Sequence, residues 1–150
     1  MRMVLAVWLP AVVALAAAAP STAGSDPIAI YQIVGDAIPA PLDDLDGDPA
    51  RGRAIVAGRK GNCLACHQAP IPEEPFHGNL GPPLDGIGSR ASAGALRLRL
   101  VAPRTLNPDT VMPAFHQVEG LRRVLAPHRG SPILTAQEIE DVIAYLVTLR

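Results

Sequence analysis

The sequence is poor in aromatic residues and in cysteine, and it has no excess of positive charge. It contains one Trp, two Tyr and two Phe, or 3% of its 150 residues, and only two Cys. Because aromatic side chains usually fill much of a core, this shortage suggests that a large bound cofactor supplies part of the missing volume. The 13 basic and 14 acidic residues give a net charge of −1, which argues against nucleic acid as a partner.

The chain also has few long hydrophobic runs, and the one that stands out lies at its N-terminus. A short basic start is followed by an uncharged stretch from Met3 to Ala19 and then by small residues. This pattern is typical of a secretory signal, predicted to span residues 1–23 with cleavage near Ala19 or Ala23. An uncleaved membrane anchor is the alternative. We therefore expect an exported protein that is soluble after cleavage, without stable membrane insertion.

After the signal, the sequence predicts an N-terminal arm and one helical domain. Residues 24–47 are rich in Pro, Asp and Gly and indicate an extended arm that packs on the domain, which we place at residues 48–150. Asp48 can cap a helix and the following proline suits its first position. These signals predict a helix over Pro49–Arg59 that stops at Gly61.

The last segment is the clearest helix. Thr135 and Glu138 have the spacing of a capping box, in which each side chain binds a free backbone N–H of the first turn. An apolar face then recurs at helical spacing: Ile139, Val142, Ile143, Leu146 and Leu149. We expect an amphipathic helix that continues to the C-terminus.

The segments between these helices are dominated by proline and glycine. Residues 68–90 and 102–116 are predicted to be loops. Residues 117–125 are predicted to form a short helical turn. Residues 95–103 are ambiguous, because the Leu-Arg alternation fits a strand whereas the residue types favour a helix.

Both cysteines lie in the stretch "GNCLACHQAP", where Cys63 and Cys66 are two residues apart and His67 follows directly. A zinc site would need a second pair of ligands at matching spacing, which the sequence lacks. A redox dithiol would open a helix after a strand, whereas here a helix precedes the motif and a loop follows it. A structural disulfide would not need the histidine.

Cys-x-x-Cys-His is the signature of c-type haem attachment. Two thiols at this spacing can add to the two vinyl groups of one haem, and the next imidazole can then bind the iron. We therefore predict one covalent haem c per chain, with Cys63 and Cys66 as thioether links and His67 as proximal iron ligand. A haem-free dithiol or disulfide protein is the alternative from another class.

Met112 is the candidate for the distal iron ligand, because it is the one methionine that remains after the signal. It lies in "NPDTVMPAFH", a loop stiffened by two prolines, whereas a lone methionine is more often core filler. The rival ligands are His116, His77 and His128, each expected to be an ordinary surface histidine. His/Met ligation fills both axial positions, which favours single-electron transfer and predicts no catalytic residue in this chain.

The segment "GPPLDGIGSR" resembles the Gly-Pro-x-Leu-x-Gly segment of class I cytochromes c. The resemblance implies an all-α, class I cytochrome c-like domain with Pro/Gly-rich loops wrapped around the haem. It also implies that the Pro82 carbonyl holds the Nδ1 proton of His67 and that Arg90 contacts a haem propionate.

A closer resemblance covers most of the chain after the signal. The segments "GRAIVAGRKGNCLACHQAP", "GPPLDGIGSR", "NPDTVMPAFH" and "LTAQEIEDVIAYLVTLR", in this order, resemble the SoxX family. SoxX is the monohaem subunit of the periplasmic SoxAX cytochrome of bacterial sulfur oxidation. The resemblance implies a SoxA-like haem subunit as partner, a SoxY–SoxZ-like sulfur carrier reached through the complex, and a small c-type cytochrome as electron acceptor.

By the same resemblance, the complex joins thiosulfate to a carrier cysteine, an L-cysteine S-thiosulfotransferase activity, and the reaction takes place on the SoxA-like subunit. This chain would then be an electron-transfer subunit and not an enzyme on its own. The alternative within haem chemistry is a stand-alone monohaem class I cytochrome c that serves another oxidoreductase.

Six arginines lie in the second half of the chain and could form a docking surface: Arg97, Arg99, Arg104, Arg122, Arg123 and Arg129. Their opposite charge to the early aspartates could steer a partner. The simpler interpretation is a solvated surface, because charge runs more often have no other role.

Overall fold

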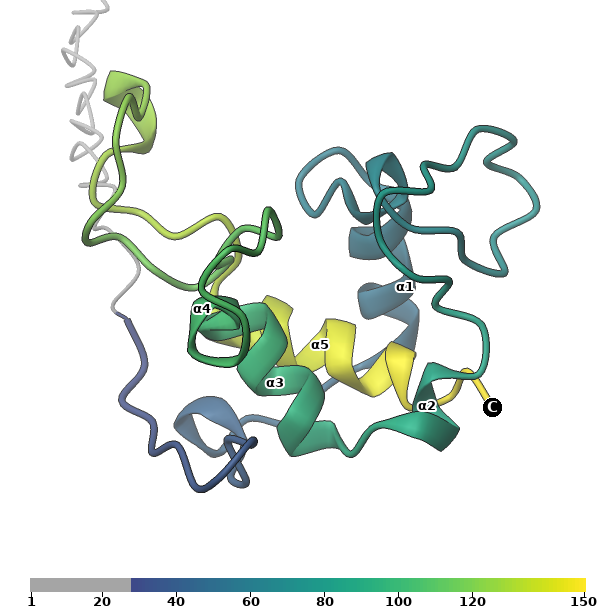
Figure 1. The fold of residues 1–150 in the computed structure, drawn as a ribbon, viewed down its shortest axis with the longest axis horizontal. Helices are drawn as coiled ribbons and strands as arrows, with labels where there is room; N and C mark the ends of the chain where they lie inside the picture. The colour runs from purple at the N-terminus through teal and green to yellow at the C-terminus, as the bar shows by residue number, and fades with distance from the viewer. Residues whose placement is uncertain (1–27) are drawn as a thin grey trace, which may run out of the picture.

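The computed structural model describes residues 28–150 (Figure 1). The predicted signal peptide and the first residues of the arm lie outside this part of the chain. Within it, four short or medium α-helices precede a longer C-terminal one, and three 3-10 turns join them: η1 (Leu42–Asp44), α1 (Pro49–Ala57), η2 (Cys63–Ala65), α2 (Ile87–Arg90), α3 (Ala93–Val101), α4 (Pro103–Leu106), η3 (Ala126–His128) and α5 (Ala136–Leu146). The predicted all-α class is confirmed.

The ends of α1 and α5 follow from local side chains. The Asp48 carboxylate accepts hydrogen bonds from the Ala50 and Arg51 N–H groups at the start of α1, as predicted. Thr135 and Glu138 form the predicted capping box at the start of α5. The two helices end earlier than expected, at Ala57 and Leu146.

Helices α1 and α5 pack directly against each other (Figure 1). A Cβ atom on Gly52 would lie 1.9 Å from the carbonyl oxygen of Asp141, so the backbones can approach this closely only because Gly52 has no side chain. The Arg51 guanidinium donates to both carboxylate oxygens of Asp141, at 2.7 Å each. Burial alone would raise the pKa of Asp141, but hydrogen bonds from Arg51, the Asp48 N–H and Gln137 outweigh it and lower that pKa.

A buried ion pair joins α3 to α5 and to the arm. Arg97 and Glu140 are 3% and 4% exposed, and the guanidinium donates to both carboxylate oxygens at 2.7 Å. Arg97 also donates to the Ile38 carbonyl oxygen at 2.7 Å, and Glu140 accepts from the Leu42 N–H at 2.9 Å. Arg97 is therefore not part of a docking surface, contrary to the expectation for this arginine.

The arm packs on the helices through Ile38 and Leu42, each 1% exposed. They join a continuous core that includes Val56 of α1, Leu98 of α3 and Ile139 of α5. Among residues 28–150, no helix combines the length and the hydropathy of a membrane span.

Three expectations for the connecting segments were wrong in detail. The predicted loop over residues 68–90 contains α2, which follows Gly86 at a positive φ of 65°. The predicted loop over residues 102–116 contains α4, which begins at a proline. Residues 117–125 contain no helix, and a 3-10 turn follows them instead. Most of the ambiguous segment, up to Val101, lies in helix α3, which the Ser92 hydroxyl caps.

Replacing Arg97 with Met should strongly destabilise the fold, because the Glu140 carboxylate would stay buried without its cation. We expect a loss of about 3–5 kcal/mol in the free energy of unfolding, measured by urea denaturation. Arg99→Met is the matched control, since Arg99 lies two residues further along α3 and is exposed. Its effect should stay within about 0.5 kcal/mol. Equal effects of the two variants would contradict a structural role for the buried pair.

Candidate cofactor site

The two thiols and the imidazole are brought together by the short turn η2. Asn62 precedes this turn in the left-handed conformation, with φ 50°. The N–H groups of Cys66 and His67 then both donate to the Cys63 carbonyl oxygen, at 3.1 and 2.9 Å. Both cysteines are free thiols and partly buried. The motif is thus a compact turn that holds two thiols and one imidazole within one short segment.

The His67 ring is oriented by the loop that follows it. Its Nδ1 lies 2.7 Å from the Pro82 carbonyl oxygen. Because a carbonyl can only accept, Nδ1 carries the proton and Nε2 keeps its lone pair for a metal. A Cβ on Gly81 would lie 2.3 Å from the ring atom Cε1, so glycine is required where this loop passes over the imidazole. The sequence placed Gly81 in a recognisable segment but gave no sign of this contact.

Met112 and His67 line the same cavity, which has a volume of about 320 Å³. This volume is at the lower end of the range typical of ligand pockets. Both cysteines, Gly81 and Pro82 also line it. The remaining lining residues come from the turn before the cysteines, from the end of the following loop and from the Met112 loop: Gly61, Asn62, Leu80, Thr110, Val111, Pro113 and Phe115. The segments of His67 and Met112, about 45 positions apart in the sequence, thus line one cavity.

The Cys63 thiol is held in its neutral form. Burial raises its pKa to about 11, although a backbone hydrogen bond acts in the opposite direction. A neutral thiol reacts slowly with metal ions and oxidants, since the thiolate is the reactive species. The site therefore differs from the low-pKa cysteines of dithiol redox proteins.

Arg90 does not line this cavity. Its guanidinium donates to the carbonyl oxygens of Asp85 and Pro83 and so braces the loop between the Pro82 contact and α2. Contact with a propionate stays a prediction.

The rival histidines occupy three different environments. His116 is 1% exposed, so the expectation of a surface residue was wrong. Both of its ring nitrogens are hydrogen-bonded, to the Ala29 N–H and to the Leu134 carbonyl oxygen. His77 is partly buried, and its Nδ1 accepts from the Ala69 N–H at 3.3 Å. None of these contacts involves the cavity that holds Met112.

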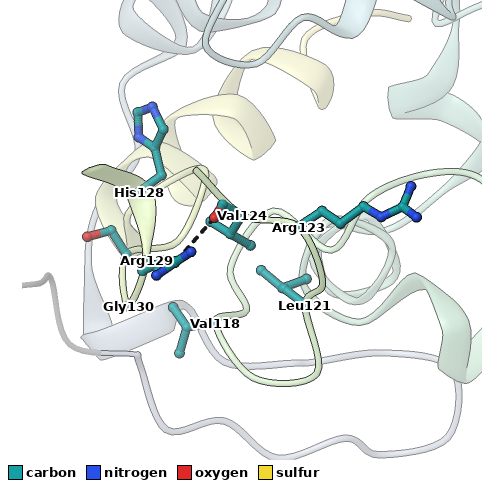
Figure 2. Close-up of a pocket in the computed structure, with 8 residues that line it drawn as sticks. Val118, Leu121, Arg123, Val124, His128, Arg129 and Gly130 are labelled. Atoms are coloured by element: carbon teal, nitrogen blue, oxygen red, sulfur yellow. Dashed lines mark hydrogen bonds between the residues drawn. The ribbon is translucent and has the colours of Figure 1, made fainter. Parts of the chain in front are cut away.

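A second, smaller cavity of about 220 Å³ lies on the loop after Phe115 (Figure 2). It is lined by Val118, Leu121, Val124 and several polar residues, and the Arg129 guanidinium on its wall donates to the Val124 carbonyl oxygen. His128 is exposed beside it. This cavity contains neither a cysteine nor a methionine, so it cannot be the attachment site.

The residues of the larger cavity fit a covalently bound haem. Two free thiols and an imidazole with an available Nε2 line this cavity. A thioether sulfur from another segment lines it as well. Apolar side chains such as Phe115 and Val111 complete the wall, as a porphyrin requires.

Comparison with known proteins agrees with this chemistry. A family model for cytochrome c matches residues 49–150. The chain therefore belongs to the cytochrome c family, whose members bind haem c covalently and transfer electrons. One chain of the crystal structure of SoxXA from P. pantotrophus is 39% identical to it, with a TM-score of 0.72; the match covers 81% of this chain and 93% of that one. This likeness confirms the resemblance to SoxX. No curated protein gave a significant match.

In the apoprotein, alkylation of Cys63 should be slow and should rise steeply with pH. A thiol with a pKa of about 11 is ionised to only about one part in a thousand at pH ~8, and its thiolate fraction grows about tenfold per pH unit. Iodoacetamide labelling of a Cys66→Ala variant, followed by mass spectrometry, would report on Cys63 alone. A rate that levels off near pH ~9, as for free cysteine, would contradict the raised pKa.

Proposed function

We propose that this chain is the electron-transfer subunit of a periplasmic, thiosulfate-oxidising complex of the SoxAX type, with His67 and Met112 as the axial ligands of one haem c. The observation that carries the ligand assignment is that both side chains line one cavity, although they come from distant segments. The similarity to a chain of SoxXA supports the choice of complex.

Each residue has a distinct task in this proposal. Cys63 and Cys66 would fix the cofactor to η2 as thioethers. His67 would bind the iron through Nε2, since the Pro82 carbonyl occupies Nδ1 and strengthens the ring as a donor. Met112 would bind the iron from the other segment that lines the cavity, the loop within residues 107–116. The bound haem would supply a one-electron couple, and a methionine ligand raises its potential.

Such a site leaves little room for chemistry on a substrate. With both axial positions taken by side chains, no substrate can reach the metal without displacing a ligand. The residues that line the cavity would therefore hold the cofactor for electron transfer to a partner. Oxidation of thiosulfate and its transfer to a carrier cysteine on a SoxY–SoxZ-like protein would take place on a SoxA-like subunit, and electrons would leave to a small c-type cytochrome.

The remaining sequence predictions belong to the same proposal. Residues 1–23 would act as the signal for export, the following arm to position 47 would pack on the domain, and residues 48–150 would form the cytochrome domain in the periplasm. Export is consistent with the motif, because c-type haem is attached outside the cytoplasm.

Met112→Ala should abolish the sulfur-to-ferric-iron charge-transfer band in the red part of the oxidised spectrum. It should also lower the midpoint potential by on the order of 0.1 V, a part of the range that axial ligands control. Val111→Ala is the matched control, because Val111 is adjacent and lines the same cavity but has no donor atom. A band that persists in the Met112→Ala protein would show that another group binds the iron.

Co-expression with a SoxA-like haem subunit should yield a 1:1 complex that copurifies through a tag on either chain. Size-exclusion chromatography with haem quantification would measure the stoichiometry. If this chain elutes as a haem-loaded monomer whatever partner is supplied, the stand-alone cytochrome would replace the proposed subunit.

A further inference from the structure

His116 lies at a junction of three segments. Its Nε2 is 3.0 Å from the N–H of Ala29 in the arm, and its Nδ1 is 2.9 Å from the carbonyl oxygen of Leu134, just before α5. The ring is 1% exposed. It is thus a buried polar side chain whose two nitrogens are fully used by backbone groups.

These two partners fix the tautomer of His116. The Leu134 carbonyl oxygen can only accept, so Nδ1 carries the proton. The Ala29 N–H can only donate, so Nε2 is unprotonated. Each nitrogen therefore has one separate link, one toward α5 and the other toward the arm.

The link to Leu134 closes a loop. Beside it, the Leu134 N–H donates to the Phe115 carbonyl oxygen at 2.8 Å. Residues 116–134 therefore leave the domain and return to it at the same point. In Figure 1 they form the segment that projects from the domain. Phe115 in turn donates its N–H to the Leu100 carbonyl oxygen of α3 at 2.8 Å. This base ties the cavity wall that Phe115 and Met112 share to α3 and to the segment that leads into α5.

The segment that carries Met112 makes few other hydrogen bonds to the domain, although Met112 itself is half-buried and packs against the core. Among the described residues, the hydrogen bonds of residues 108–114 have partners only within residues 107–112, such as the Met112 N–H to the Thr110 hydroxyl at 3.2 Å. The first hydrogen-bonded anchor after Met112 is therefore the Phe115–His116 base, which begins with the Phe115 N–H bond to Leu100. A thioether is a weak donor, so its occupancy of the iron depends on how well this segment is held in place.

We propose that His116 is a positioning residue for Met112 and that it acts through its Nδ1 link to Leu134, whereas its Nε2 link only fastens the arm. This inference rests on the proposed ligation by Met112. Of the two hydrogen bonds of the ring, the one to Leu134 would influence how Met112 binds the iron, and the one to Ala29 would not.

Two substitutions can remove the links one at a time in the holoprotein. The amide nitrogen of Asn takes the place of Nδ1, so His116→Asn can keep the donor to Leu134 and lose the acceptor for Ala29. The amide oxygen of Gln takes the place of Nε2, so His116→Gln can keep the arm contact and lose the link to Leu134. The readouts are the sulfur-to-iron charge-transfer band and the affinity for added imidazole, which competes with Met112.

His116→Gln should weaken the band and bind imidazole about tenfold or more tightly, because the affinity of a competitor rises with the fraction of iron that Met112 has released. His116→Asn should keep the band and stay within about threefold of the parent. Asp48→Ala is the control for general destabilisation, since it removes the α1 cap, whose hydrogen bonds involve no residue of the Met112 loop. Its imidazole affinity should match that of the parent.

The outcomes separate this inference from the ligand assignment. If the parent lacks the band, or if Met112→Ala keeps it, Met112 is not the ligand and both proposals fall. If the parent has the band but the Gln variant behaves like the Asn variant or the parent, the ligation stands and the positioning role is wrong. A Gln variant that fails to retain haem while the Asn variant retains it supports the proposal, and failure of both contradicts it.

Discussion

The fold depends on the buried ion pair between Arg97 and Glu140, because it joins α3, α5 and the arm at one point. Desolvating two charges is costly, and the pair is tolerable only because its geometry is bidentate and its remaining hydrogen-bonding capacity is used by the Ile38 carbonyl and the Leu42 N–H. Because the buried Glu140 carboxylate accepts the Leu42 N–H, the ion pair also fixes the position of the arm along the helices. The interaction therefore adds specificity to a core that has few aromatic side chains.

The crossing of α1 and α5 then sets where the attachment motif begins. Gly52 lets the two backbones touch, and Asp141 binds both the Arg51 side chain and the Asp48 N–H at the helix start. With α1 fixed in this way, the chain leaves Gly58 and reaches η2 after only a few residues. The thiols and His67 thus follow closely after a helix that is packed along its length, whereas Met112 lies on a loop whose hydrogen bonds reach the rest of the described domain only at its two ends. Positions on rigid elements suit covalent attachment, and a loop position makes the weaker sulfur ligand sensitive to its supports.

The residues of the site are arranged to hold a cofactor and not to react with a substrate themselves. Burial keeps the Cys63 thiol neutral, and the Pro82 carbonyl fixes the protonated nitrogen of His67, so that the other nitrogen is available. Gly81 lets the loop pass directly over the imidazole. These features favour a cofactor that is held permanently, in keeping with membership of the cytochrome c family and with transfer of single electrons.

The sequence by itself determined the class of chemistry and the two main helices. The spacing of Cys63, Cys66 and His67 has few other uses, and the caps at Asp48 and Thr135 act over three residues, so local order was enough to predict them. Tertiary structure decided the rest: Arg97 is buried although its neighbours in sequence suggested a charged surface, and His116 is a double hydrogen-bonding partner and not a surface residue. Segment 95–103 became a helix because the domain offered a core for Leu98 and a carboxylate for Arg97. Such outcomes depend on distant partners, 43 residues away for Arg97 and Glu140 and 87 for His116 and Ala29, which no local pattern encodes.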